Sequence, residues 1–250
     1  LMQQSYTGCN PRGLLLSRDK PLCKQLLAYH RIPTPQFAVL RRGIKFRVPS
    51  RLRYPLFVKS ATEDASLGIA QASVIQDPQQ LRDRVAFIHD QIGTDALVEE
   101  YVDGREVYVG MLGNERLTRL PVWELSFGSL VQGQAGIATR KVKWDRKYQQ
   151  RHGITRAAAI DLAPAMVARL NALSRRIYRS LGLSGYARMD FRIRADGQVF
   201  LLEANANPCL AQVEDFSQSA LSAGIGYQDL LARIVALGLA YKAEWRADYA

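Results

Sequence analysis

Two acidic residues near the end of the chain are spaced so that they could hold a metal ion. Segment 186–206 contains two apolar runs separated by Asp196-Gly197, a dipeptide that favours a two-residue turn between antiparallel strands. Counting outward from such a turn places Asp190 directly opposite Glu203. Like charges facing each other destabilise a hairpin. The pattern therefore predicts a compensating cation at this position.

The same register puts Arg188 opposite Asn205, and alternation along the strands places both on the face of the two acids. The other face is apolar and is expected to pack on a core: Met189, Phe191, Ile193, Phe200, Leu202 and Ala204. Carboxylate and amide oxygens suit Mg²⁺, with phosphate oxygens completing its shell. The alternative is a solvated polar face neutralised by Arg188 and Arg192. The position of Glu203 at the end of an apolar run argues against that alternative, because an unpaired charge is costly there.

A second feature is a lysine followed by a loop of small residues. Lys59 ends an apolar run, and the loop after it extends to Gly68. Backbone N–H groups of such a loop can hold phosphate oxygens while the lysine supplies a point charge. The loop has no Walker A spacing, and no GxGxxG follows a strand, so the two commonest nucleotide motifs are excluded.

Further polar residues lie on or beside expected strands. Glu99 and Glu100 point to opposite faces of one strand, so one must face inward, where it either contacts a nucleotide or is an ordinary strand acid. Glu106 after the Asp103-Gly104 turn has the same ambiguity. The basic run around Lys141 and Lys143 is read as a solvated surface, because one short run without interleaved aromatic residues is poor support for nucleic-acid binding.

Composition narrows the class of protein. The 250 residues are 48% hydrophobic and 23% charged, which is typical of a globular chain. The net charge of +11 favours anionic partners. No apolar run is long enough to span a bilayer, and no membrane partner is expected. Three cysteines without CxxC spacing indicate a reducing compartment, so a cytoplasmic location is expected.

The elements that must position these residues alternate between helices and strands. Helices are expected over 19–31, 77–93, 161–181 and 227–241, and strands over 54–60, 70–75, 96–102, 105–112, 186–194 and 198–206. Residues 126–155 read as a long irregular loop, and residues 1–15 show little periodicity. This order predicts an α+β protein of two lobes divided near Gly104.

Six groups of motifs follow one another along the chain: YTG, SRDKPLCKQLL with IPTPQF, LFVKSATEDASLGI, ALVEEYVDGREVYVGML, GYARMDFRI and LLEANANP. In these motifs and their order the chain resembles the ATP-grasp superfamily and, within it, the D-alanine–D-alanine ligase family. The resemblance implies an α+β ATP-grasp fold in which two α+β lobes enclose the nucleotide. Residues 1–18 are then a remnant of a preceding domain or a linker, 19–104 the small lobe, and 105–250 the large lobe with the metal and catalytic site.

The resemblance also implies a reaction, in which ATP phosphorylates a carboxylate and an amine attacks the acyl phosphate to give an amide, ADP and phosphate. By position, the resemblance makes Lys20, Lys59 and Lys143 the phosphate-binding lysines and assigns Ser66 to a phosphate lid. It assigns adenine contacts to Glu99 and the Val102 backbone, and a ribose contact to Glu106. Asp190, Glu203 and Asn205 are the magnesium ligands, for two ions that Mn²⁺ can replace. Arg188, Lys143 and Ser66 are the catalytic residues, with Arg188 stabilising charge in the transition state.

Three positions depart from the family pattern: Ala65 replaces a serine, Trp144 a tyrosine and Cys209 a glycine. Because the serine and tyrosine help to hold the first amino acid, the resemblance supports ATP and acyl-phosphate chemistry more firmly than D-alanine as substrate. It implies small amino-acid or peptide substrates, a homodimer, and an N-terminal domain missing from this chain. A nucleotide-binding module without ligase activity, or a ligase for other amino acids or peptides, stays open as an alternative.

Overall fold

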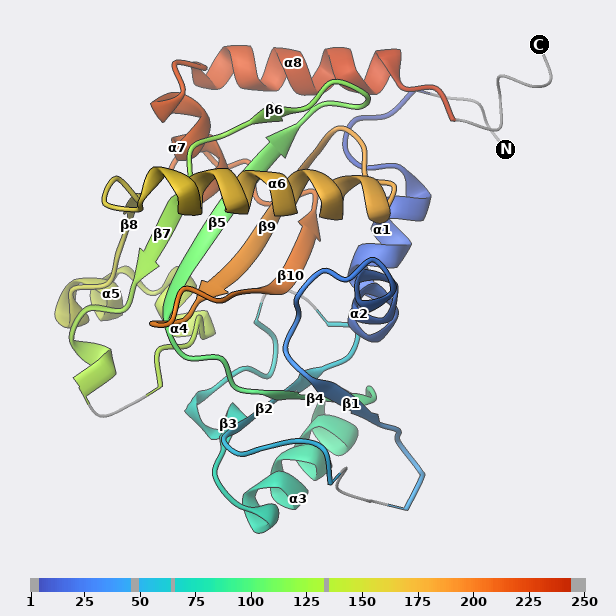
Figure 1. The fold of residues 1–250 in the computed structure, drawn as a ribbon, viewed down its shortest axis with the longest axis vertical. Helices are drawn as coiled ribbons and strands as arrows, with labels where there is room; N and C mark the ends of the chain where they lie inside the picture. The colour runs from blue at the N-terminus through green and yellow to red at the C-terminus, as the bar shows by residue number, and fades with distance from the viewer. Residues whose placement is uncertain (1–4, 46–49, 64–65, 133–134, 244–250) are drawn as a thin grey trace.

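A computed structural model describes residues 5–243, apart from 46–49, 64–65 and 133–134. The strands are β1 (Phe37–Leu40), β2 (Leu56–Ser60), β3 (Val74–Ile75), β4 (Ala96–Glu100), β5 (Arg105–Leu112), β6 (Thr118–Arg119), β7 (Trp123–Ser126), β8 (Thr155–Ala158), β9 (Tyr186–Ile193) and β10 (Val199–Ala206). They form two antiparallel sheets, one of four strands and one of six, which lie at opposite ends of the view in Figure 1.

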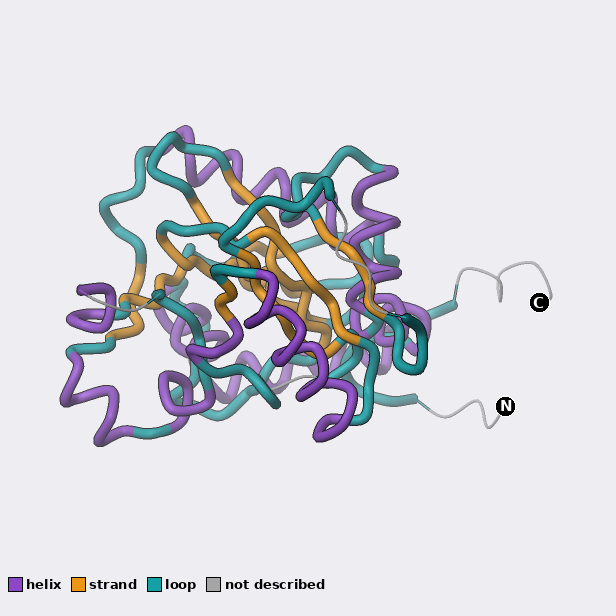
Figure 2. The backbone as a smooth tube through the Cα atoms, turned by 90° about the horizontal axis from the view of Figure 1, so that it is seen from below, coloured by secondary structure: helices purple, strands orange, loops and turns teal. Residues whose placement is uncertain are grey.

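The helices connect and cover these sheets. They are α1 (Pro11–Arg18), α2 (Lys20–Tyr29), α3 (Pro78–Phe87), α4 (Arg140–Trp144), α5 (Arg146–His152), α6 (Pro164–Ser180), α7 (Asp215–Ser222) and α8 (Tyr227–Ala240). Two short 3₁₀ segments, η1 (Gln71–Ser73) and η3 (Gly128–Gln132), and one π-helical turn, η2 (Ile88–Ile92), complete the elements. The purple and orange segments of Figure 2 show helices on several sides of the strands.

The smaller sheet has the strand order β1-β4-β2-β3 and is packed against α3. The side chain of Asp77 accepts the first free N–H groups of α3, and Gly93 ends the helical segment in the left-handed conformation, as the sequence predicts. Leu81, Val85 and Ile88 of this segment share one apolar cluster with β2 and β4. This sheet therefore has its own core.

The larger sheet has the order β10-β9-β5-β7-β8, with β6 paired to β5. Helix α6 crosses one face (Figure 1) and packs its apolar side chains, such as Leu170 and Ile177, on Met189 and Phe191 of β9. Because strand side chains alternate, Arg188, Asp190 and Arg192 must lie on the opposite face. The packing of α6 thus determines which face of the large sheet carries charge.

Helices α1 and α2 pack on the larger sheet. Cys23 and Leu27 of α2 belong to the same apolar cluster as α6 and β9. Residues 1–18, which were expected to be a remnant or linker, contain α1. Asn10 caps this helix by accepting from the Gly13 N–H at 2.9 Å. The Asn10 side-chain amide also donates to the Gly182 carbonyl at 2.7 Å. The proposed domain boundaries at 18 and 104 stay a prediction.

Several expected elements differ from the structure. Residues 126–155 were expected to be irregular, but they contain η3, α4 and α5; Thr139 and Asp145 cap the two α-helices through their side-chain oxygens. The strand expected over 70–75 is reduced to β3 because η1 occupies its first half. The short elements β1, β6, β7, β8 and α7 carry too little periodicity to be predicted.

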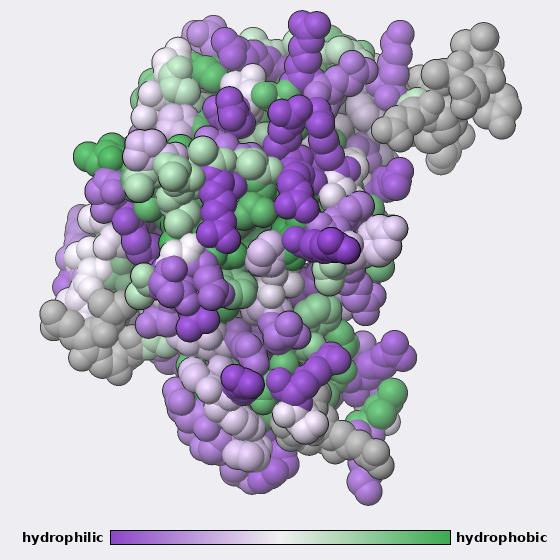
Figure 3. All heavy atoms as spheres, in the orientation of Figure 1, coloured by the Kyte–Doolittle hydropathy of each residue, from purple (hydrophilic) through white to green (hydrophobic). Residues whose placement is uncertain are grey.

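The surface is largely hydrophilic on the face that carries α6, with apolar side chains scattered between polar ones (Figure 3). Within the described residues, no single helix combines the length and apolar character needed to cross a membrane; α7 and α8, bent by 106°, meet that criterion only when counted together. All three cysteines are free thiols.

Candidate active site

The hairpin of β9 and β10 brings the two acids together. Asp190 pairs with Glu203 and Arg188 with Asn205, so the predicted register is confirmed at these four residues. The two acids also line one pocket between the sheets. The juxtaposition on which the metal prediction depends is therefore present.

The turn itself differs from the prediction. The Arg194 N–H donates to the Gln198 carbonyl, so three residues, not two, connect the strands. This would shift every pair by one residue, but a β-bulge at Leu202 restores the register before the acids are reached. Between the turn and the bulge, the strand face that packs on the core is the one opposite to the prediction. Val199 and Leu201 are buried in the core, whereas the sequence predicted Phe200 and Leu202.

Asp190 is held by two neighbours. Arg188 donates to both of its carboxylate oxygens, from Nε at 2.7 Å and Nη2 at 2.9 Å, and the Asn205 amide donates at 3.0 Å. Burial raises the pKa of Asp190, and the Arg188 charge opposes that rise. The Arg188 guanidinium also stacks over the Tyr108 ring at 4.5 Å. Arg188 is consequently fixed beside the acid pair.

Glu203 has a different environment. Its carboxylate lies 3.0 Å from the Lys20 ammonium. Burial alone would raise the pKa of Glu203, but the charges of Lys20, Lys59 and Lys143 lower it to about 2. Glu203 is therefore ionised at neutral pH and offers a carboxylate of unit negative charge.

The acids and Asn205 fit a magnesium site. Within the described residues no group of three or more His, Cys, Asp or Glu side chains could hold a metal ion by itself. Mg²⁺ is usually bound by one or two carboxylates together with phosphate oxygens of a substrate. Two facing carboxylates and one amide, at a pocket that three lysines also line, match that pattern.

Three lysines from different elements reach the same pocket. Lys20 lies at the start of α2, Lys59 on β2 and Lys143 on α4, and all three line the pocket with the acids. Lys20 also donates to the Glu63 carbonyl at 2.7 Å, which joins α2 to the loop after β2. The ammonium groups can bind the phosphates of a nucleotide, and the two carboxylates that face them can bind its metal ion.

Glu99 is the inward-facing acid of its strand, and Glu100 is partly exposed. The Glu99 carboxylate lies 2.5 Å from the Lys24 ammonium and 2.9 Å from that of Lys59. Burial alone would raise the pKa of Glu99, but the two lysines hold it below the usual range. Burial lowers the pKa of Lys24, against the effect of the Glu99 charge.

Glu106 is held by an arginine that the sequence reading used only as a surface counter-charge. Arg192 donates to one Glu106 oxygen at 2.6 and 3.1 Å, and the Tyr108 hydroxyl donates to the other at 2.8 Å. Arg192 also contacts the carbonyls of Val102, Gly104 and Gly136. This arginine fixes both the Glu106 carboxylate and the connection between the two sheets.

The loop after β2 touches the segment around α4. Ser66 has a left-handed backbone with φ of 60°, and its hydroxyl donates to the Ala138 carbonyl at 2.8 Å. A non-glycine residue with this φ is strained unless its surroundings hold it, and the bond to Ala138 does so. Ala65 lies outside the described residues.

The structure gathers most of the predicted site residues in one place. Nine of the eleven line the pocket: Lys20, Lys59, Ser66, Glu99, Val102, Glu106, Lys143, Asp190 and Glu203. The remaining two, Arg188 and Asn205, bind Asp190 from the side. Trp144 is 49% exposed and Cys209 is exposed as well. Both of these residues, which depart from the family pattern, are therefore accessible to solvent.

Three polar residues near the site were not singled out from the sequence, and a fourth, Arg192, was considered only as a surface counter-charge. Lys24 follows Lys20 by four positions on one helix, and Arg192 follows Asp190 by two on one strand, so both had a detectable spacing. Arg156 donates to the Lys143 carbonyl at 2.5 Å and to Glu214 at 3.0 Å. Asp215 lies 3.6 Å from Arg188. The last two contacts join distant segments and leave no local pattern.

Comparison with known proteins identifies the family of the chain. Residues 26–236 match the family model described as D-ala D-ala ligase C-terminus. The uncharacterized protein y4sG of Sinorhizobium fredii is 34% identical over 230 residues, covering 92% of this chain and 65% of that protein. The D-alanine–D-alanine ligase of Bordetella petrii is 31% identical over 238 residues, covering 94% and 68%. The chain thus spans about two thirds of the length of these relatives.

Solved structures share the fold. The D-alanine–D-alanine ligase of Bacillus anthracis complexed with ATP superposes with a TM-score of 0.77 at 22% identity, covering 98% of this chain and 72% of that one. The VanG D-Ala:D-Ser ligase of Enterococcus faecalis gives 0.75 at 23% identity, covering 93% and 64%. The match across 26–236 and the two-lobed α+β architecture show that the chain belongs to the D-alanine–D-alanine ligase family of ATP-grasp enzymes.

Proposed function

We propose that the chain is an ATP-dependent carboxylate–amine ligase that forms an amide through an acyl phosphate. The observation that carries the proposal is the facing pair Asp190 and Glu203, which shares a pocket with Lys20, Lys59 and Lys143. The two acids offer oxygen ligands to a divalent cation, although Lys20 and Arg188 pair with them in this structure, and the clustered ammonium groups offer partners to an anion. A nucleoside triphosphate with magnesium supplies both.

In this proposal the nucleotide lies between the sheets. Val102, Glu99 and Glu106 line this pocket. In the proposal, Val102 and Glu99 contact the base, and Glu106 accepts from ribose hydroxyls. The relatives named as D-alanine–D-alanine ligases support small amino acids or peptides as substrates. ATP supply and three free thiols favour a cytoplasmic enzyme. A homodimer and an N-terminal domain stay predictions.

The magnesium ligands in this proposal are Asp190, Glu203 and Asn205, for two ions, with Mn²⁺ as a substitute. When bound, the metal would neutralise charge on the phosphates. Asp190 would have to turn one oxygen from Arg188 toward the ion, since both of its oxygens are engaged by the guanidinium.

The protein's own groups then act on the two substrates. A carboxylate oxygen of the first substrate attacks the γ-phosphorus, and the bond to ADP breaks. Lys20, Lys59 and Lys143 hold the phosphates, and Ser66, which lines the same pocket, is assigned to the phosphate lid. The amine of the second substrate attacks the acyl carbon, loses a proton, and phosphate leaves. Arg188 stabilises the negative charge that develops on oxygen in both steps.

The test is a substrate panel. The purified protein is incubated with ATP, Mg²⁺ and single or paired D- and L-amino acids and dipeptides, and ADP and phosphate are measured. The proposal expects stoichiometric ADP and phosphate release that depends on both amino substrates, with an amide product by mass spectrometry. ATP binding without release across the panel would refute ligase activity and favour a nucleotide-binding module.

A further inference from the structure

One buried carboxylate of the pocket is shared by two lysines. Glu99 on β4 is 2% exposed, and its oxygens lie 2.5 Å from Lys24 and 2.9 Å from Lys59. Lys24 and Lys59 are 3% and 7% exposed. Two positive charges and one negative charge thus lie together, out of contact with bulk water, where an uncompensated charge is costly.

The two lysines differ in what they can reach. Lys59 lines the pocket, whereas Lys24 does not belong to its lining and lies behind Glu99. Within the described residues, the Lys24 ammonium has no hydrogen-bond partner beyond its ion pair with Glu99. Lys20, one helical turn earlier, pairs with Glu203 on the larger sheet. Helix α2 therefore anchors an acid of each sheet through lysines on one face.

The charges identify what Lys24 contributes. Glu99 with a single lysine would form a pair of zero net charge, which would not attract an anion. With Lys24 as a permanent counter-ion of Glu99, the surplus positive charge belongs to Lys59, the lysine that faces the pocket.

We propose that Lys24 is a positioning residue: it holds and neutralises Glu99, so that the Lys59 ammonium stays free to bind a phosphate group. The inference rests on the proposed function, in which this pocket binds a nucleoside triphosphate. Without Lys24, Lys59 is the one ion-pair partner that the Glu99 carboxylate keeps among the residues that the structure describes. Phosphate affinity then falls although every group that lines the pocket is unchanged.

The experiment uses tripolyphosphate, which has no base or ribose, so that contacts of Glu99 with adenine do not enter. Its binding is measured by calorimetry in the presence of Mg²⁺. Lys24→Met should weaken binding about tenfold, the value of one lost charge-assisted hydrogen bond. Lys24→Arg should retain the parental affinity. The double variant Lys24→Met with Glu99→Gln should recover most of the loss, because Lys59 then has no carboxylate to neutralise it.

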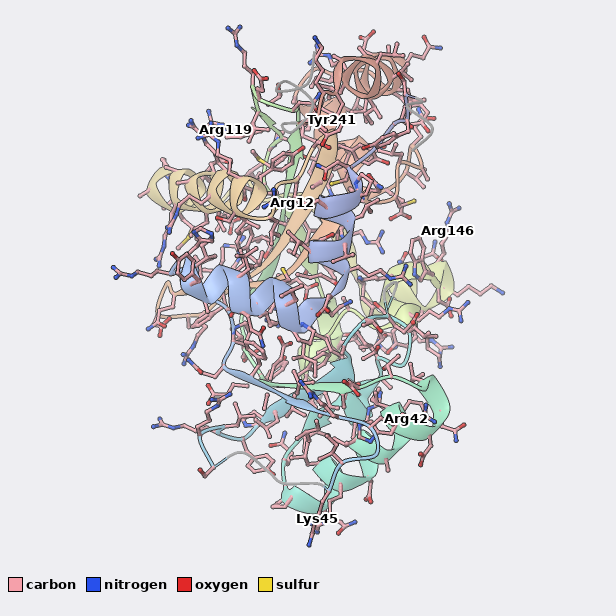
Figure 4. All side chains as sticks on the ribbon, turned by 90° about the vertical axis from the view of Figure 1, so that its right-hand side faces the viewer. Arg12, Arg42, Lys45, Arg119, Arg146 and Tyr241 are labelled. Carbon is pink, nitrogen blue, oxygen red and sulfur yellow. The ribbon has the colours of Figure 1, made fainter. Side chains whose placement is uncertain are left out.

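Lys45→Met is the matched control, because it removes the same charge from an exposed lysine at the far tip of the smaller lobe (Figure 4). It should bind like the parent. Parental affinity in Lys24→Met, or a double variant no better than Lys24→Met, would overturn the inference. A merely structural role would make the double variant weaker still. A parent that binds neither tripolyphosphate nor ATP would refute the proposed function, and this inference with it.

Discussion

Replacing Glu106 by glutamine should destabilise the protein, because it leaves a buried arginine without its counter-charge. Arg192 is 2% exposed and Glu106 5%, and their side chains are joined by two hydrogen bonds. Breaking a buried pair from one side costs about 3–5 kcal/mol. Because backbone carbonyls still accept hydrogen bonds from Arg192, the expected loss in the free energy of unfolding lies at the lower end of this range, about 3 kcal/mol. For a chain of this length that lowers Tm by about 6–12 °C.

The assay is thermal unfolding followed by circular dichroism, with Glu124→Gln as the matched control. Glu124 also forms a two-bond pair with an arginine, Arg105, but that side chain is 36% exposed, so its loss should cost at most about 1 kcal/mol. Adding Arg192→Met to Glu106→Gln should recover part of the lost stability, because no unpaired charge remains although three carbonyls lose their donor. If Glu106→Gln melts no lower than the control, the buried pair does not carry the energy assigned to it.

Three further outcomes are expected. Asp215→Asn should lower kcat about tenfold with little change in the KM for ATP, since it loosens Arg188 from one of its anchors; an unchanged kcat in ADP-release assays would contradict this. At about pH 8 a thiol reagent should modify Cys209 alone in the folded protein, because Cys9 and Cys23 are buried and burial raises the pKa of both thiols, that of Cys23 to about 11; a second fast-reacting thiol would be contrary to expectation. Gly104→Ala should cost about 1–3 kcal/mol, because φ is 129° and the new Cβ meets the carbonyl of the last residue of β9; an unchanged Tm would exclude this strain.

The hairpin shows how far the sequence alone could lead. Facing acids on a polar strand face were predicted from alternation and a turn dipeptide, and the acids do face each other. The assumed turn was wrong, and the bulge at Leu202 compensated for it. The position of a bulge depends on how the whole sheet packs, so it could not be predicted from a local pattern of residues.

Contacts between segments distant in the sequence were the features that the sequence predicted least well. Lys24 and Arg192 share the spacing of predicted site residues, and a stricter reading of helix and strand faces would have found them. Arg156 joins the Lys143 carbonyl to the start of α7, two segments that only the folded chain brings together. Short capped helices such as α4 were missed because five residues are too few to show a period.

The most direct test of the account is metal binding by the acid pair. Mn²⁺ binding in the presence of ADP is followed by electron paramagnetic resonance for the parent, Asp190→Asn and Glu203→Gln, with circular dichroism as the check on folding. The account predicts nucleotide-dependent Mn²⁺ binding by the parent and its loss in both folded variants, together with loss of turnover. Parental Mn²⁺ affinity and ADP release in either variant would contradict the central claim.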